Sequence, residues 1–196
     1  VQDRQIRDGL RHYTLQGAMG RLLDAEEDGL RNGSFQVFEM EHLMNTGDVN
    51  AVPVLAYLFH RIEQRLTGRP TLIVIDEAWK ALDNAYFAER LSNWLVTARK
   101  QNTVAVMMTQ YASQLERTRT GKTIVEAVPT QILLPNIRAQ PADYAMLNLT
   151  EKELDVLLNT GSNSRLALIR DDQGSIVVDA DLSALGPNLT ILGGME

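Results

Sequence analysis

Apolar and polar positions in the first half of the chain predict strands that alternate with helices. Residues 34–40 alternate between apolar and polar side chains, which predicts a strand with one covered face. Residues 71–75 are almost entirely apolar and predict a strand buried on both faces. Apolar side chains at helical spacing predict one helix over 52–66 and another over 87–98. Strands joined through helices are typical of a parallel sheet.

The second half of the chain continues with short elements. They are, in order, a buried strand at 103–110, an apolar strand at 130–134, short helices at 141–147 and after the capping box of 150–153, and a hairpin of strands at 165–170 and 175–179. Together with the first half, this order predicts an α/β fold with one doubly wound, mostly parallel sheet and an edge hairpin.

Three regions differ in character along the chain. Residues 1–33 are polar and helix-prone and predict a small helical subdomain. Residues 34–185 hold the predicted strands and form the expected core domain. Residues 186–196 are expected to be a C-terminal tail.

Composition narrows the class of protein. With 196 residues, 44% hydrophobic and 22% charged, the chain has the size and content of about one soluble globular domain. It contains no cysteine, which excludes disulfides and thiolate metal sites, and no apolar run long enough to span a bilayer. A net charge of −6 argues against a protein whose whole surface binds nucleic acid. His12, His42 and His60 lack ligand spacing, and the first residue, Val1, suggests a fragment or a processed chain.

Two adjacent acids, Asp76 and Glu77, directly follow the apolar strand 71–75. Open α/β sheets bind ligands at the carboxyl ends of their strands, so the acids are expected at such a site. This is the layout of a Walker B strand, in which Asp76 holds Mg²⁺ through water and Glu77 polarises the water that attacks a γ-phosphate. The alternative is a core strand whose end happens to be acidic and exposed.

The phosphate-binding half of such a site is absent from the sequence. Residues 120–123 read Thr-Gly-Lys-Thr, but Glu116 occupies the position where a P-loop needs its first glycine. The stretch also follows the acidic strand, whereas a P-loop follows the first strand of such a domain. We interpret it as a loop or the start of a helix, and we expect the P-loop upstream of Val1.

Several motifs in fixed order resemble one bacterial family. They are Val37-Phe-Glu-Met-Glu-His-Leu-Met-Asn45, Leu58-Phe-His-Arg-Ile-Glu63, Pro70 to Trp79, Ala98-Arg-Lys100, Thr109-Gln110 and Leu133-Leu-Pro-Asn136. From about residue 12 to about residue 183, the chain resembles the C-terminal domain of the VirB-four/TrbE/CagE ATPases of type IV secretion and conjugation. The resemblance implies a RecA-like fold of the P-loop NTPase type. The chain departs from the family pattern because its Walker A loop is missing.

The resemblance assigns roles to individual residues. Asp76 matches the acid that binds Mg²⁺, Glu77 the catalytic base, and Gln110 a residue that senses the γ-phosphate and orients water. Arg99 matches an arginine that reaches the γ-phosphate of a neighbouring subunit. The alternatives are a strand-end amide for Gln110 and a cation at the end of a helix for Arg99.

Three further residues lie near the predicted strand ends. Asn136 and Arg138 follow the strand 130–134 and are candidates for contact with phosphate. Trp79 is interpreted as a packing residue, as large aromatic side chains usually are.

The resemblance also implies cofactors and partners. It implies ATP and Mg²⁺ in the full-length protein, a homo-hexamer, other components of the secretion channel and inner membrane as partners, and a peripheral location on the cytoplasmic side of the inner membrane. The chain itself is expected to be soluble, inactive alone, and monomeric or weakly associated. Two other functions stay open, a docking module without catalysis and a DNA translocase that binds nucleic acid directly.

Overall fold

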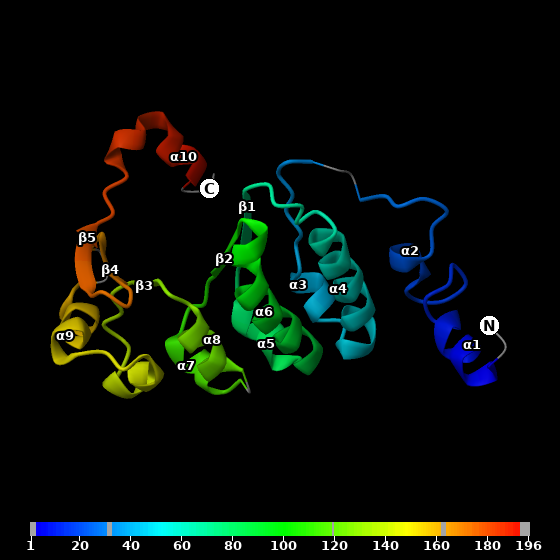
Figure 1. Cartoon of the computed structure of the whole chain (residues 1–196), viewed down its shortest axis with the longest axis horizontal. Coiled ribbons are helices and arrows are strands. Elements are labelled where there is room, and N and C mark those ends of the chain that lie inside the picture. The colour runs from blue at the N-terminus through cyan, green and yellow to red at the C-terminus, as the bar shows by residue number, and fades with distance from the viewer. Residues whose placement is uncertain (1–2, 31–32, 119, 162–163, 193–196) are drawn as a thin grey trace. The chain divides into compact units, whose positions relative to one another are not determined.

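The computed structural model describes residues 3–30, 33–118, 120–161 and 164–192. The chain forms two units, residues 1–71 and 72–196, and each is described by itself. Figure 1 shows the first unit in blue to cyan and the second in green to red. Within the described ranges, no helix combines the length and the apolar character needed to cross a membrane.

The first unit is helical. Its elements are α1 (Arg4–Arg11), α2 (Gly20–Leu23), α3 (Glu41–Met44) and α4 (Asp48–Glu63). Helix α1 begins at Asp3, whose carboxylate accepts hydrogen bonds from the backbone N–H groups of Gln5 and Ile6. Helix α4 confirms the helix predicted over 52–66, and it buries Ala51, Leu55 and Phe59 on one face because these residues are four positions apart.

A proline inside α4 shapes how α4 joins the segment after α1. Pro53 has no backbone N–H, so the carbonyl of Val49 lacks its usual donor within the helix. The hydroxyl of Tyr13 donates a hydrogen bond to that carbonyl, at 2.5 Å. The neighbouring His12 ring is within 2.8 Å of the Asn50 side-chain oxygen, measured from Nε2. The segment after α1 is thereby fixed to the first turns of α4.

The prediction of a strand at residues 34–40 is wrong. These residues form a bend and an irregular segment, and α3 begins directly after them. Phe35 and Val37 are 85% and 76% exposed, so the alternating apolar positions do not cover a core. The physical reason is that a strand needs a partner for its backbone groups, and the paired strands of the described chain all come later in the sequence.

The second unit contains the strands of the described structure. Its first element is β1 (Thr71–Ile75), which begins at the last residue of the first unit. The others are α5 (Ala78–Asp83), α6 (Ala85–Thr97), η1 (Ala98–Gln101), β2 (Thr103–Met107), α7 (Ala112–Glu116), α8 (Gly121–Ala127), β3 (Gln131–Leu133), η2 (Pro141–Leu147), α9 (Glu151–Asn159), β4 (Leu166–Arg170), β5 (Ser175–Asp179), η3 (Ser183–Asn188) and α10 (Leu189–Leu192). Apart from the strand at 34–40, each predicted strand and helix is present, with ends shifted by a few residues. The prediction that the strand at 103–110 is buried is wrong, because Val104 and Val106 are 61% and 38% exposed.

The described strands form two sheets, where the sequence predicted one. Strands β1 and β2 pair with each other (Figure 1). Their ends have the parallel pattern, since Met108 donates to the Ile75 carbonyl and accepts from the backbone N–H of Ala78. Strand β3 was expected in the same sheet, but it pairs antiparallel with β4. Strand β5 completes the predicted hairpin, with Leu168 opposite Val177.

Helix α6 supplies much of the core of the second unit, where it contacts α5, η1 and α8. Its buried face is set by apolar residues at helical spacing, namely Phe87, Ala88, Leu91 and Trp94. One face of the β1–β2 sheet is open to solvent, because Leu72, Val74 and Val104 are 64%, 52% and 61% exposed. The prediction that residues 71–75 are buried on both faces is therefore wrong for the described structure.

A second core joins the three-stranded sheet to η2 and α9. It consists of Tyr144 and Leu147 from η2, Leu157 from α9 and Leu168 from β4, all less than 10% exposed. Helix α9 begins with the predicted capping box, in which the Glu153 carboxylate accepts the backbone N–H of Thr150 at 2.8 Å. The expected tail from residue 186 is helical at its start, through η3 and α10.

Candidate functional site

The two parallel strands end side by side and bring three of the predicted site residues together. Asp76 and Glu77 follow β1, and Gln110 lies three residues after the end of β2. The Gln110 side-chain amide donates a hydrogen bond from Nε2 to Glu77 Oε1, at 2.7 Å. The acids and the amide thus form one cluster at the carboxyl edge of this sheet, as the sequence analysis expected.

The backbone of Glu77 turns the chain from β1 into α5. Glu77 has φ 49° and ψ 41°, the left-handed region that few residues other than glycine adopt. Asp76 Oδ1 accepts the backbone N–H of Glu77 at 2.8 Å and so stabilises this turn. A strained backbone of this kind persists only where the surrounding structure holds it in place, and such residues cluster at functional sites.

Trp79 makes a contact that the sequence analysis missed. Its indole Nε1 donates to Glu77 Oε2 at 2.5 Å, so the two oxygens of one carboxylate have donors from two separate segments, α5 and the loop after β2. The interpretation of Trp79 as a packing residue alone did not anticipate this bond. The spacing of two residues carries no such signal in itself, since the contact depends on the left-handed backbone at Glu77.

The remaining predicted residues are outside this cluster or outside the described atoms. Asn136 follows β3, where its Oδ1 accepts the backbone N–H of Arg138 at 3.0 Å and its own N–H donates to the Leu157 carbonyl at 2.8 Å. These bonds shape the turn after β3 and do not reach Glu77. The backbone of Arg99 lies in η1, but its side chain is outside the described part of the structure.

The donor set at this edge fits a hydrated magnesium ion. Asp76 is exposed, so its carboxylate faces solvent, while Glu77 is half-buried. Mg²⁺ in nucleotide sites keeps several waters and takes one or two carboxylates together with phosphate oxygens. A single exposed acid satisfies that need without a cage of protein ligands, and within the described residues no group of three or more acids, histidines or cysteines could form one.

The Thr-Gly-Lys-Thr stretch is confirmed as the start of a helix. Gly121 is buried at the beginning of α8, and a Cβ atom there would lie 1.9 Å from the backbone oxygen of Leu115. This glycine is therefore required by the close approach of two backbone segments. It gives no sign of a phosphate cradle, which needs several backbone amides around one space.

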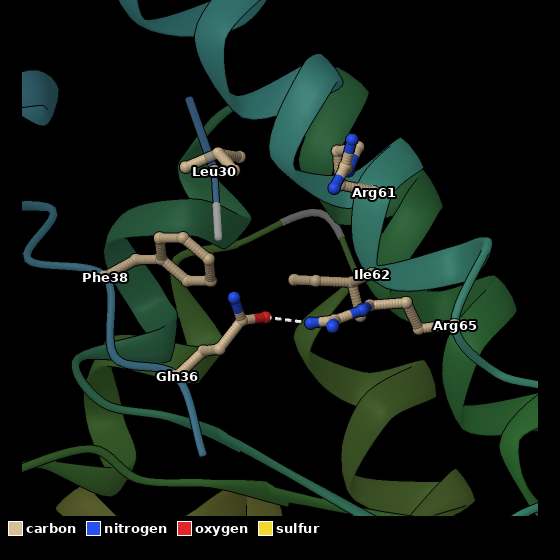
Figure 2. A pocket seen from close by; sticks show the side chains of 6 residues that line it. All are labelled: Leu30, Gln36, Phe38, Arg61, Ile62 and Arg65. Atoms are coloured by element: carbon tan, nitrogen blue, oxygen red, sulfur yellow. Dashed lines mark hydrogen bonds between the residues drawn. The ribbon is translucent and has the colours of Figure 1, made fainter. Parts of the chain in front are cut away.

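The first unit contains a small pocket (Figure 2). It is lined by Leu30, Gln36, Phe38, Arg61, Ile62 and Arg65. Arg65 donates to the side-chain oxygen of Gln36, and Arg61 forms an ion pair with Asp28. The cavity is about 10 Å³, which is room for roughly one water molecule. It is too small for a nucleotide.

An α/β domain with an acid pair and an amide at adjacent parallel strand ends has the features of a P-loop NTPase of RecA-like fold. A family comparison agrees, since the model of the TraG P-loop domain matches residues 4–170. The chain belongs to this family, and its resemblance to the VirB4/TrbE proteins of type IV secretion is confirmed.

Relatives with known names were found by sequence and by structure. The conjugal transfer protein TrbE of Rhizobium radiobacter is 44% identical over 191 residues, which cover 95% of this chain and 23% of the relative. The type IV secretion system protein virB4 of Bartonella quintana is 34% identical over 179 residues, which cover 90% of this chain and 23% of the relative. The structure of VirB4 of Thermoanaerobacter pseudethanolicus superposes with a TM-score of 0.68 at 21% identity. The match covers 93% of this chain and 50% of the VirB4 chain. The chain thus spans about a quarter of the length of these two sequence relatives.

Proposed function

We propose that this chain supplies the acidic half of an ATP-hydrolysing site in a type IV secretion protein. The observation that carries the proposal is the 2.7 Å hydrogen bond from Gln110 to Glu77, beside Asp76 at the ends of two parallel strands. The family membership and the relatives named TrbE and VirB4 support the same function.

Each residue has a distinct part in the proposed reaction. Glu77 accepts a proton from the attacking water, and Gln110 orients both the carboxylate and that water. Asp76 would hold Mg²⁺ through water. The ion, when it is bound with ATP, neutralises charge on the phosphates. Arg99 of one subunit reaches the γ-phosphate of a neighbour, and Asn136 and Arg138 contact phosphate from the turn after β3.

The proposed hydrolysis belongs to the full-length protein. No G-x-x-x-x-G-K-[ST] motif occurs in these 196 residues, and we propose that another part of the protein provides the phosphate cradle. We expect the full-length protein to act as a hexamer on the cytoplasmic side of the inner membrane, where turnover drives substrate transfer or pilus assembly. The isolated chain is expected to be inactive, and to sediment as a monomer or a weak associate.

The direct test is ATP turnover by the full-length protein with Glu77→Gln. Loss of a general base typically lowers the rate about 10²- to 10⁴-fold. We expect the rate of ATP turnover to fall in this range, with ATP binding retained. Glu89→Gln is the matched control, because Glu89 is an exposed acid on α6 and undergoes the same change of charge. Unimpaired hydrolysis by the Glu77→Gln protein would refute the catalytic assignment.

One observation favours the docking function as a second candidate. The exposed apolar face of β1 and β2 presents Leu72, Val74 and Val104 to solvent. Contiguous exposed apolar side chains are typical of interaction sites. If this face docks a channel component, Val104→Asp abolishes its co-purification with the purified component, whereas Glu77→Gln does not. Equal recovery of both variants would rule this face out as a docking surface.

A further inference from the structure

The carboxylate of Glu77 is held at both of its oxygens. Gln110, beyond the end of β2, donates to Oε1 at 2.7 Å. Trp79, in the first turn of α5, donates to Oε2 at 2.5 Å. Two donors from separate segments determine the direction of the carboxylate and also its plane, because both ends of the O–C–O unit are then fixed.

We propose that Trp79 is a positioning residue that orients Glu77 for proton transfer through its indole N–H. This inference rests on the proposed function, in which Glu77 is the general base. Each carboxylate oxygen has about two lone-pair sites, so one donor on each oxygen still leaves a site for the proton of a water molecule. The contact with Trp79 is therefore compatible with catalysis by the same group.

Indole is well suited to this task because its ring nitrogen is a donor and never an acceptor. It cannot exchange roles with the carboxylate, so the contact holds the carboxylate in one orientation. The backbone at Glu77 adds a reason for a second support. A residue held at φ 49° stays in place only where neighbouring contacts fix it, and Trp79 lies two residues further along the same turn.

The contact is tested first by NMR on this chain, without any need for hydrolysis. The sequence has two tryptophans, Trp79 and Trp94, so two indole N–H signals are expected, and Trp94→Phe assigns them. We expect Glu77→Gln to move the Trp79 signal upfield, since its proton loses a charged acceptor. Glu89→Gln is the control and should leave both signals in place. A Trp79 signal that does not respond to Glu77→Gln overturns the contact.

The positioning role is then tested by kinetics of the full-length protein. Trp79→Phe removes the donor and keeps an aromatic ring, and 3-benzothienylalanine at position 79 replaces the N–H with sulfur at almost unchanged shape. We expect either change to lower kcat about 10- to 100-fold, with KM within about twofold, because misorientation of a catalytic group affects the chemical step and leaves binding intact. The isostere separates this effect from any loss of packing.

The outcomes separate this inference from the proposed function. An isostere with wild-type kcat overturns the positioning role, even if the NMR contact is present. If Glu77→Gln hydrolyses ATP at the wild-type rate, the proposed function fails and the positioning role fails with it, while NMR still reports whether the contact exists. A shifted indole signal together with a lower kcat supports the inference.

Discussion

The backbone of Glu77, with φ 49° and ψ 41°, combines local strain with a proposed chemical role. Only the carboxylate is needed for chemistry, yet the left-handed turn aims it across the strand end toward Gln110. Asp76 supports the turn through the backbone N–H, and Trp79 supports the side chain. At the scale of single residues, the site is therefore one turn held by three neighbours.

The left-handed backbone at Glu77 predicts that a variant with glycine at this position is more stable than one with alanine. Glycine adopts positive φ freely, whereas alanine has a Cβ and pays roughly 1–2 kcal/mol there. We therefore expect Glu77→Gly to have a higher free energy of unfolding than Glu77→Ala by about 1 kcal/mol. Both variants should be equally inactive, because neither has a carboxylate. Urea denaturation of the chain measures the difference.

The control is the same pair of changes at Glu89, in the interior of α6. In a helix alanine is more stable than glycine by about 1 kcal/mol, so the order should reverse there. If alanine is also the more stable replacement at residue 77, the left-handed backbone is not present in solution.

Elements are held together by side chains that replace missing backbone hydrogen bonds. In α4, Pro53 leaves the Val49 carbonyl without a donor in the helix, and the Tyr13 hydroxyl takes that place. In α9, the Glu153 carboxylate caps the backbone N–H of Thr150 and is only 8% exposed as a residue. Both contacts lead to measurable predictions.

Tyr13 and Pro53 should be energetically coupled. We expect Tyr13→Phe to destabilise α4 by about 1 kcal/mol, the usual worth of one hydrogen bond. The effect should be smaller in a Pro53→Ala background, because alanine supplies the missing N–H to the Val49 carbonyl. Hydrogen exchange of α4 amides measures the local stability. Tyr57→Phe, which removes a hydroxyl from α4 itself, is the control, and equal effects of Tyr13→Phe in both backgrounds would refute the coupling.

Glu153 should make the second unit sensitive to acid. The hydrogen bond from the backbone of Thr150 lowers the pKa of Glu153 below its ordinary value of 4.5, with smaller help from the hydroxyls of Thr150 and Ser175 and the charge of Arg170, against opposition from burial. A lowered pKa in the folded state stabilises the protein above pH 4.5, and this stabilisation is lost as pH falls through the folded value.

Glu153→Gln isolates the pH-dependent part of this stabilisation, because glutamine has no titratable carboxylate and can still complete a capping box. We expect the variant to be less stable than the wild type at pH 7, and the two free energies of unfolding to converge as the pH is lowered below 4.5. Urea denaturation at several pH values is the measurement. A difference between the two proteins that stays constant with pH would contradict the lowered pKa.

At the scale of the whole molecule, local patterns were predictable and long-range pairing was not. Periodicity predicted β1, α6 and β2, and the polar residues after both strands predicted the cluster of Asp76, Glu77 and Gln110. The strand at 34–40 failed because alternation identifies a candidate face but not the neighbour that would pair with it. The pairing of β3 with β4, in place of the first sheet, is likewise a choice between distant partners.

The burial of the strands was the second feature that the sequence did not predict. Uniformly apolar residues in β1 predicted two covered faces, yet Leu72 and Val74 are more than half exposed. An apolar run shows that a strand can be buried, but the covering layer has to be supplied by other segments. Trp79 was missed for a similar reason, because its bond to Glu77 depends on a backbone turn that residue types alone do not determine.

The most direct test of the central claim is a double-mutant cycle in ATP turnover by the full-length protein. We propose that Glu77 and Gln110 act as one unit in catalysis, joined by the hydrogen bond between them. Groups that act together in catalysis give strongly non-additive losses. We predict that adding Gln110→Ala to Glu77→Gln lowers kcat little further, although Gln110→Ala alone lowers it clearly. Fully additive losses, or a Gln110→Ala protein with wild-type turnover, would contradict a shared site.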